Sequence, residues 1–211
     1  MLRITLNIFV ALFAAAVTLR AAQQAPIVQP GAPGSSSRVI TAAEASDLSA
    51  VGYTAEDVTF MQGMIAHHAQ ALEMTALRPA RSRREALRLL ALRIELSQAD
   101  EIKAMEAWLT ARGVKVPDAH NAHTGVAAPP MPGMLTADEM ARLSKSNGAA
   151  FDRLFLEFMI KHHDGALVMV EDLFRTPGSG QESAIFAFAS DVVDDQRAEI
   201  ARMSALLKEL R

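Results

Sequence analysis

Two pairs of adjacent histidines are the residues of this chain whose type and spacing could do chemistry. One pair is His67-His68 and the other is His162-His163. Met64 precedes the first pair by about one helical turn, and Met159 precedes the second pair in the same way. Neutral imidazole nitrogens bind many metal ions, and the methionine thioether is a soft ligand. The repeated combination predicts two equivalent groups of metal-ligating side chains.

Amide and acidic side chains occupy a second set of equivalent positions. Gln98 and Glu101 correspond to Gln196 and Glu199, and all four fall where a plain helical bundle would place leucine. A buried carboxylate is costly unless it is paired, protonated or bound to a metal. We therefore expect Glu101 and Glu199 to orient imidazoles by hydrogen bonding rather than to bind the ion themselves.

Metal binding competes with simpler interpretations of these residues. Methionine at helical spacing is a common core filler, so Met74 and Met169, two turns further along the same stripes, are interpreted as core residues. His120 and His123 have a chelating spacing, but they fall in a breaker-rich linker that predicts a solvated loop. A closed hydrogen-bond network of histidine and glutamate would instead make the chain a metal-free structural or partner-binding bundle.

Helices must position these side chains, and the sequence repeats one helical hairpin twice. Residues 57–68 match residues 152–163 position by position, and the second helices match as well. Capping patterns and Pro or Gly breakers predict helices near residues 54–77, 83–112, 149–174 and 181–210, a short extra helix from Thr136, and no strand. One hairpin cannot bury its apolar stripe alone. We therefore predict an all-α four-helix bundle of two hairpins related by an approximate two-fold axis.

The bundle is predicted to occupy residues 46–211, with hairpin repeats at 54–112 and 147–211 and a linker at 113–146. Residues 1–22 are predicted to be a signal peptide, because Arg3 precedes an apolar run that small residues follow. An uncleaved membrane anchor is the alternative, but the run is short and partly polar for a span. Residues 23–45 are predicted to be a flexible tether. We expect a periplasmic or secreted protein.

The composition argues against a nucleic-acid partner and favours a metal ion. The chain has 21 Lys+Arg against 24 Asp+Glu and a net charge of −3, so it lacks the basic excess that nucleic-acid binding requires. It contains no cysteine, which leaves methionine and histidine as the soft-metal donors. This donor set suits Cu(I) or Ag(I), and imidazole also accepts Cu(II). A metal ion is the expected partner, and membrane contact is expected only through an uncleaved leader. The sequence indicates no particular protein partner.

The same residues resemble a known family, the domain of unknown function numbered three hundred and five. The resemblance is carried by residues 60–68 and 155–166, by Met131-Pro-Gly-Met134, and by the two Gln-x-x-Glu-Ile-x-x-Met runs. It implies a ferritin-like four-helix bundle that is usually exported, and some relatives are implicated in copper or silver handling outside the cytoplasm. Phe158 stands where relatives often have a second methionine, which implies weaker soft-metal binding in this copy.

These observations predict an exported protein that sequesters or delivers copper or silver. Its main ligands would be the four histidines, His67, His68, His162 and His163, with Met64 and Met159 as supporting donors. A ferritin-like di-metal enzyme is the alternative function. Such sites use a glutamate from each of two helices and a Glu-x-x-His motif from each of the other two. No Glu-x-x-His falls on the predicted seam, so the sequence favours a binding protein over an enzyme.

Overall fold

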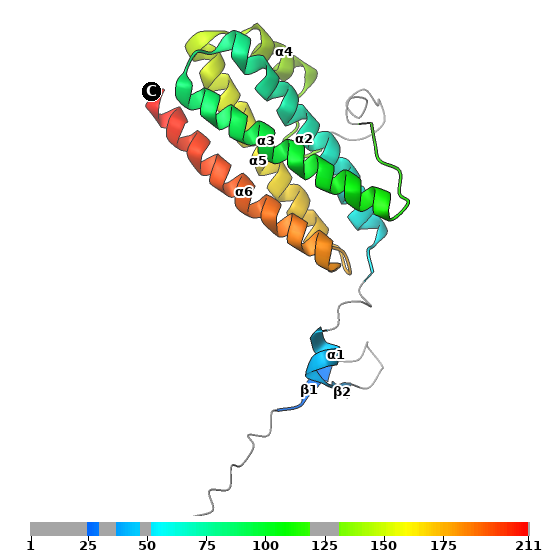
Figure 1. Cartoon of the computed structure of the whole chain (residues 1–211). Coiled ribbons are helices and arrows are strands. Elements are labelled where there is room, and N and C mark those ends of the chain that lie inside the picture. Colours follow the sequence, from blue (N-terminus) through cyan, green and yellow to red (C-terminus); the bar gives the residue numbers. More distant parts are fainter. Residues whose placement is uncertain (1–24, 30–36, 47–51, 119–130, 211) are drawn as a thin grey trace, which may run out of the picture. The chain divides into compact units, whose positions relative to one another are not determined.

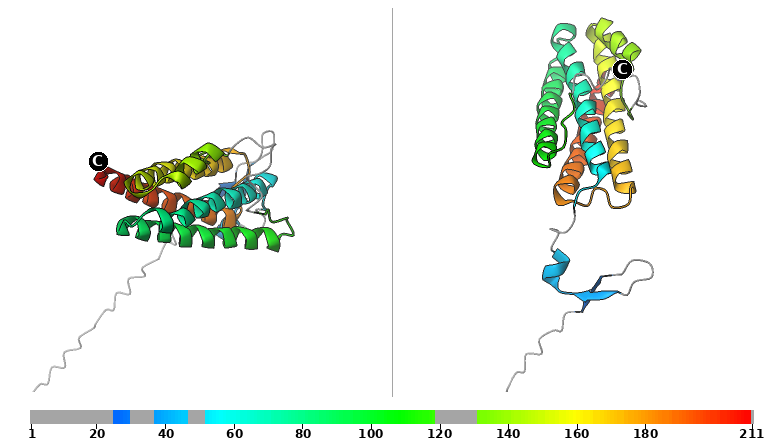
Figure 2. Two further views of the ribbon diagram at one scale, coloured as in Figure 1. Left: turned by 90° about the horizontal axis from the view of Figure 1, so that it is seen from above. Right: turned by 90° about the vertical axis from the view of Figure 1, so that its right-hand side faces the viewer.

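The computed structural model describes residues 25–29, 37–46, 52–118 and 131–210. Four long helices run side by side in a bundle (Figures 1 and 2). They are α2 (Ala55–Arg81), α3 (Glu85–Ala111), α5 (Gly148–Arg175) and α6 (Ser183–Glu209), and the shorter α4 (Ala137–Lys145) precedes α5. The predicted all-α bundle is confirmed, and the predicted helix from Thr136 is α4, which starts with a capping box.

One predicted helix end is wrong. The sequence predicted that α2 stops before Pro79, but the helix continues to Arg81. Proline removes one backbone donor and therefore one hydrogen bond of the ladder. Pro79 lies in the last turn, and the N–H of Ser82 still donates to the carbonyl of Arg78 at 2.9 Å. The helix can therefore accommodate the proline so close to its end.

Two equivalent aspartates join the hairpins at their ends. Asp57 completes a capping box with Thr54 at the start of α2, and its other oxygen accepts from the N–H of Gly180 at 2.7 Å. Asp152, at the matching position of α5, accepts from Nε of Arg84 at 3.2 Å. Each first helix is thus tied to the turn of the opposite hairpin, as a two-fold relation between the hairpins requires.

The apolar core consists of two clusters, and equivalent residues of the repeat lie in opposite ones. Phe60 and Met105 belong to one cluster, whereas their counterparts Phe155 and Met203 belong to the other. A two-fold axis between the hairpins produces this exchange. Within the bundle, α2 packs on α3 and on α5, α5 packs on α6, and α3 approaches α6 less closely than these pairs approach each other.

The chain divides into two compact units, Met1–Asp47 and Leu48–Arg211. In the first, β1 (Ile27–Gln29) pairs antiparallel with β2 (Arg38–Ile40), and α1 (Ala42–Ser46) follows. The prediction of a chain without strands is wrong here, and part of the predicted tether has regular structure. Ile and Val favour strands, but three-residue strands are too short to show an alternating pattern. The predicted signal peptide lies outside the described residues, and no helix of the described chain is long and apolar enough to cross a membrane.

Candidate metal centre

A layer of polar side chains crosses the middle of the bundle. The four histidines and Gln98 have no exposed surface, and Gln196 and Glu199 are 1% exposed. On each long helix these residues fall between a stretch that packs in one apolar cluster and a stretch that packs in the other. The two hairpins therefore contribute matching polar residues to one level of the core.

His67 and His162 meet across the two hairpins. Their ring centres are 3.8 Å apart, with 36° between the ring planes. Nε2 of His67 lies 3.0 Å from the carbonyl oxygen of Pro132, and Nε2 of His162 lies 2.9 Å from the carbonyl oxygen of His67. A carbonyl oxygen only accepts hydrogen bonds, so Nε2 carries the proton on both rings. In the neutral ring Nδ1 therefore carries the lone pair.

His68 and His163 each contact a glutamate of their own hairpin. Nε2 of His163 lies 2.7 Å from Oε2 of Glu199, and Nε2 of His68 hydrogen-bonds Oε2 of Glu101 in the same way. The Ser97 hydroxyl donates to the other oxygen of Glu101 at 3.2 Å. The structure thus places each glutamate on the second histidine of its own hairpin, a pairing that the sequence left open.

Several polar atoms of the layer are left without a hydrogen-bond partner in the described part of the chain. Nδ1 of His68, His162 and His163 is buried and has no hydrogen-bond partner among the described residues, and the same holds for both amide atoms of Gln98 and for Oε1 of Gln196. Leaving a buried polar atom unsatisfied costs about 1–3 kcal/mol. So many of them at one level of a core are unusual for a purely structural layer.

Burial keeps His162 neutral. Loss of solvation holds the pKa of His162 well below its usual range, and charge repulsion from His67, His163 and His68 lowers it further. The hydrogen bond to the His67 carbonyl acts in the opposite direction and is the smallest of these effects. His162 is therefore neutral at neutral pH, which is the state in which imidazole binds a metal ion.

The spacing of the rings distinguishes the histidine pairs. The ring centres are 6.3 Å apart in His67-His68 and 6.2 Å apart in His162-His163. A nitrogen–metal bond is about 2 Å long and the nitrogen lies about 1 Å from the ring centre, so two imidazoles that share one ion through facing nitrogens need centres about 6 Å apart. The consecutive histidines of one helix have this spacing, whereas the stacked pair across the hairpins is too close.

The predicted methionine donors lie on opposite sides of the layer. Met64 is fully buried in the cluster that contains Phe60, and Met159 is fully buried in the cluster that contains Phe155. Within the described ranges, no group of three or more histidine, aspartate or glutamate side chains could hold a metal ion. His120 and His123 lie outside the described residues.

The loop before α4 completes the layer, and the sequence did not predict this role. The Gln70 side-chain amide donates to the carbonyl of Leu135 at 3.0 Å and accepts from its N–H at 2.7 Å. Gly165 lets this loop approach α5 closely, because a Cβ atom there would lie 2.1 Å from the carbonyl oxygen of Pro132. Gln70 lies one turn after His67 on the same helix. His67 and Gln70 are two polar residues one turn apart on a buried face of α2. This pattern could have predicted that a backbone segment packs there and pairs with them.

One surface groove borders the polar layer. It has a volume of about 500 Å³, lies between α3 and α6, and is lined by Leu89, Leu92, Arg93, Leu96, Ser97 and Asp195. Ser97 hydrogen-bonds Glu101, and Nε of Arg93 lies 3.8 Å from Oε1 of Glu199. Burial, followed by repulsion from Glu101 and Glu199, raises the pKa of Asp195. The two glutamates of the layer thus lie next to residues that line this groove.

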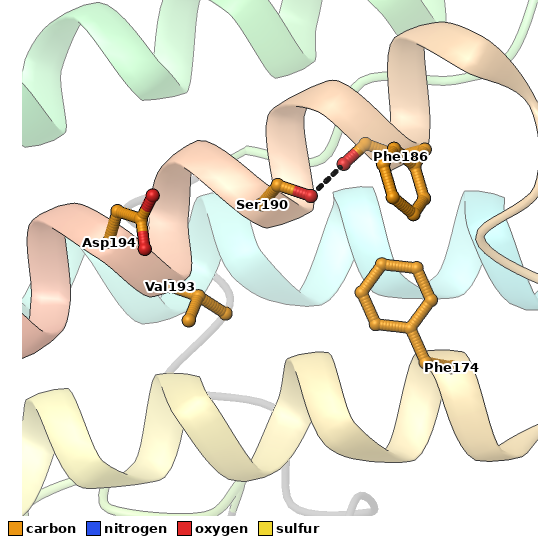
Figure 3. A pocket seen from close by; sticks show the side chains of 5 residues that line it. All are labelled: Phe174, Phe186, Ser190, Val193 and Asp194. Atoms are coloured by element: carbon orange, nitrogen blue, oxygen red, sulfur yellow. Dashed lines mark hydrogen bonds between the residues drawn. The ribbon is translucent and has the colours of Figure 1, made fainter.

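A second groove lies between α5 and α6, away from the histidines (Figure 3). The rings of Phe174 and Phe186 meet edge to face across it, with centres 5.7 Å apart. Val193, Ser190 and Asp194 complete a lining that includes no residue of the polar layer. This groove therefore has no part in the candidate metal centre.

Comparisons with known proteins identify the family. The family model described as Domain of unknown function (DUF305) matches residues 57–207. The chain belongs to the DUF305 family. A DUF305 fragment from Deinococcus radiodurans is 33% identical with a TM-score of 0.63, and the match covers 74% of this chain and 98% of that chain. A DUF305 protein from Streptomyces coelicolor, provisionally described as secreted, is 30% identical with a TM-score of 0.62 over 74% of this chain and 93% of that chain.

The protein CopM, solved with bound metal, is also similar to this DUF305 chain. Its Cu(I)-bound form is 25% identical with a TM-score of 0.57, over 72% of this chain and 96% of that chain. Its Cu(II)-bound form is 26% identical with a TM-score of 0.59, over 74% and 97%. Ag-bound and apo forms of CopM match as well. This likeness is consistent with a metal-related function. The search of curated proteins found no match.

Proposed function

We propose that this DUF305 protein is an exported binding protein that holds copper or silver ions in its histidine layer. One observation carries the proposal: each consecutive histidine pair combines a ring spacing of 6.2–6.3 Å with Nε2 atoms held by acceptors. Those acceptors leave Nδ1 as the metal-binding nitrogen of the neutral rings. The likeness to CopM, solved with Cu(I), Cu(II) and Ag bound, supports the same conclusion.

Each hairpin would bind one ion. In the first hairpin the ligands are the His67-His68 pair and Met64, and in the second they are the His162-His163 pair and Met159. Imidazole and thioether together suit Cu(I) and Ag(I) better than hard cations. The glutamates that accept from His68 and His163 fix ring orientation and make the opposite nitrogen more basic. A site without exposed surface shields the ion from competing ligands, which suits sequestration or protected delivery.

The hydrogen bonds of the layer favour binding over di-metal enzyme chemistry. Both glutamates that the seam provides already accept from histidine Nε2. Di-metal enzymes of the ferritin-like type bind their ions mainly with carboxylates. A layer whose carboxylates hold histidines, rather than metal, retains too few oxygen ligands for that chemistry.

Metal titration of the full chain, purified without a polyhistidine tag, tests the proposal. We expect the quadruple variant His67→Gln, His68→Gln, His162→Gln, His163→Gln to bind two Ag(I) ions fewer than the parent. We expect the variant of either pair alone to bind one fewer. Circular dichroism should show helix content close to that of the parent in the pair variants. If the quadruple variant binds as many ions as the parent, the histidine layer is structural and the proposal fails.

Export is the second part of the proposal, supported by the Arg3-led apolar run and by the provisionally secreted relative. Mass measurement of the protein recovered from outside the cytoplasm tests it. We expect a mature N-terminus near Gln23. Full-length protein confined to the cytosolic fraction would contradict export without bearing on metal binding.

A further inference from the structure

Two methionine side chains outside the histidine layer approach the same point on one face of α2, beside Gly63. Sδ of Met131 and Cε of Met169 each lie 3.5 Å from the point where a Cβ atom on Gly63 would stand. Met131 comes from the loop before α4 and Met169 from α5, so three segments far apart in the sequence converge here. Both methionines are half-buried, whereas Met64 and Met159 have no exposed surface. This pair is therefore within reach of an ion from solvent.

The backbone that carries Met131 is held in place from several sides. The carbonyl of the next residue, Pro132, accepts from His67 at 3.0 Å. Leu135 makes two hydrogen bonds with the side chain of Gln70. Gly133 lies so close to α5 that a Cβ atom there would stand 2.5 Å from the carbonyl oxygen of Lys161. A ligand on a fixed backbone loses less conformational entropy when it binds, which favours binding.

The second hairpin has no counterpart of this methionine pair. Gly63 corresponds to Phe158 in the repeat, and Phe158 is buried with the guanidinium of Arg142 5.5 Å from its ring centre. A side chain as large as phenylalanine at position 63 would fill the space in which the two methionines converge. The space over Gly63 that the two methionines occupy is therefore found in the first hairpin and not at the equivalent position of the second.

We propose that Met131 and Met169 form a second, solvent-accessible site for one soft monovalent cation, Cu(I) or Ag(I), apart from the histidine layer. Thioether sulfur is uncharged and soft, so it selects these ions over Zn²⁺, Mg²⁺ or Ca²⁺. Thioethers need not lose a proton to bind, so binding here is independent of pH where imidazole binding weakens. The site goes beyond the proposed function and does not depend on it.

Ag(I) titration of the full chain with ¹³C-methyl-labelled methionine tests the site. We expect the methyl signals of Met131 and Met169 to shift as one ion binds, both at pH 7 and at pH 5. The double variant Met131→Leu, Met169→Leu keeps side-chain volume and should bind one ion fewer than the parent. Met140→Leu is the matched control, because Met140 is also half-buried but lies on α4, and it should bind as many ions as the parent.

The triple variant His68→Gln, His162→Gln, His163→Gln separates this site from the histidine layer, because it keeps His67, which holds the Pro132 carbonyl next to Met131. We expect it to retain one Ag(I) ion together with the methyl shifts of Met131 and Met169. If it folds poorly, the single variant Met131→Leu in the parent should still lower the ion count by one. Unmoved methyl signals of both methionines, or a double leucine variant that binds as many ions as the parent, would show that the pair only packs against Gly63. These outcomes can be interpreted even if the histidine layer binds no ions, because the methyl shifts report on Met131 and Met169 directly.

Discussion

Glu199 shows how a single side chain can fix the orientation of a candidate metal ligand, His163. Its side chain is 2% exposed and holds Nε2 of His163 at 2.7 Å, with Arg93 3.8 Å from its other oxygen. Glu101 is 15% exposed and is supported by the Ser97 hydroxyl instead. The two equivalent glutamates therefore have different surroundings. The second hairpin has the more enclosed carboxylate.

Replacing Glu199 by glutamine should weaken binding of one ion. Glutamine can still accept from His163, but a neutral acceptor makes the opposite ring nitrogen less basic. Loss of such a carboxylate partner typically costs 10–100-fold in metal affinity, and we expect about that loss for one of the two histidine-layer ions in competition titrations. Glu139→Gln is the control, because Glu139 pairs with Lys161 at the surface. Equal Ag(I) affinities of the Glu199→Gln variant and the parent would contradict this role.

At the scale of elements, two glycines decide how closely the loop before α4 can lie on its neighbours. A Cβ atom on Gly165 would stand 2.1 Å from the carbonyl oxygen of Pro132, whereas a Cβ atom on Gly63 would make only ordinary contacts at 3.5 Å. Both glycines lie inside long helices, where alanine is normally favoured by up to about 1 kcal/mol. The two positions can therefore be compared directly for the effect of an added Cβ atom.

We expect Gly165→Ala to destabilise the protein by about 1–3 kcal/mol, the usual cost of forcing extra atoms into packed structure. Backbone must move, because the atom in the way is a carbonyl oxygen rather than the end of a flexible side chain. Gly63→Ala should leave stability unchanged or raise it slightly. Urea unfolding of both variants measures the difference. If the Gly165→Ala variant is as stable as the Gly63→Ala variant, the loop before α4 moves away from α5 at little cost and the prediction is wrong.

The stability of the whole molecule should depend on pH through the buried side chain of His162. His162 has a pKa well below 6.5 in the folded chain, and its value after unfolding is about 6.5. Below about pH 6.5 His162 is protonated in the unfolded chain but stays neutral in the folded chain. The free energy of unfolding therefore falls as the pH falls. The loss reaches at most about 1.4 kcal/mol per pH unit until the folded pKa is reached. Above it, this residue contributes no pH dependence.

Urea unfolding of the metal-free protein between pH 8 and pH 5 measures this effect. We expect a decline in the free energy of unfolding below about pH 6.5 that is smaller in His162→Gln. Parallel curves for the parent and the variant would show that His162 does not titrate differently in the two states. Bound metal should raise the free energy of unfolding, because ions that bind only the folded chain stabilise it. It should not flatten the decline, because a bound ion keeps the imidazoles of the folded chain unprotonated.

The sequence by itself determined the features that depend on local pattern. Helical spacing, capping boxes and breakers predicted the long helices to within a few residues, and the internal repeat predicted equivalent His-His pairs on two hairpins. The three-residue strands β1 and β2 and the passage of α2 through Pro79 escaped prediction. Short strands carry too little pattern, and a proline in a last turn costs too little to end a helix.

Only the tertiary structure decided which atoms of the layer meet. The stacking of His67 on His162 and the acceptor role of the Pro132 carbonyl join segments that are far apart in the chain. Their distances follow from how closely the two hairpins pack and from the close approach at Gly165. Helical periodicity fixes the direction of a side chain around its own axis but says nothing of the distance to the next helix. The sequence therefore named the histidines, and packing decided which acceptor each Nε2 atom meets.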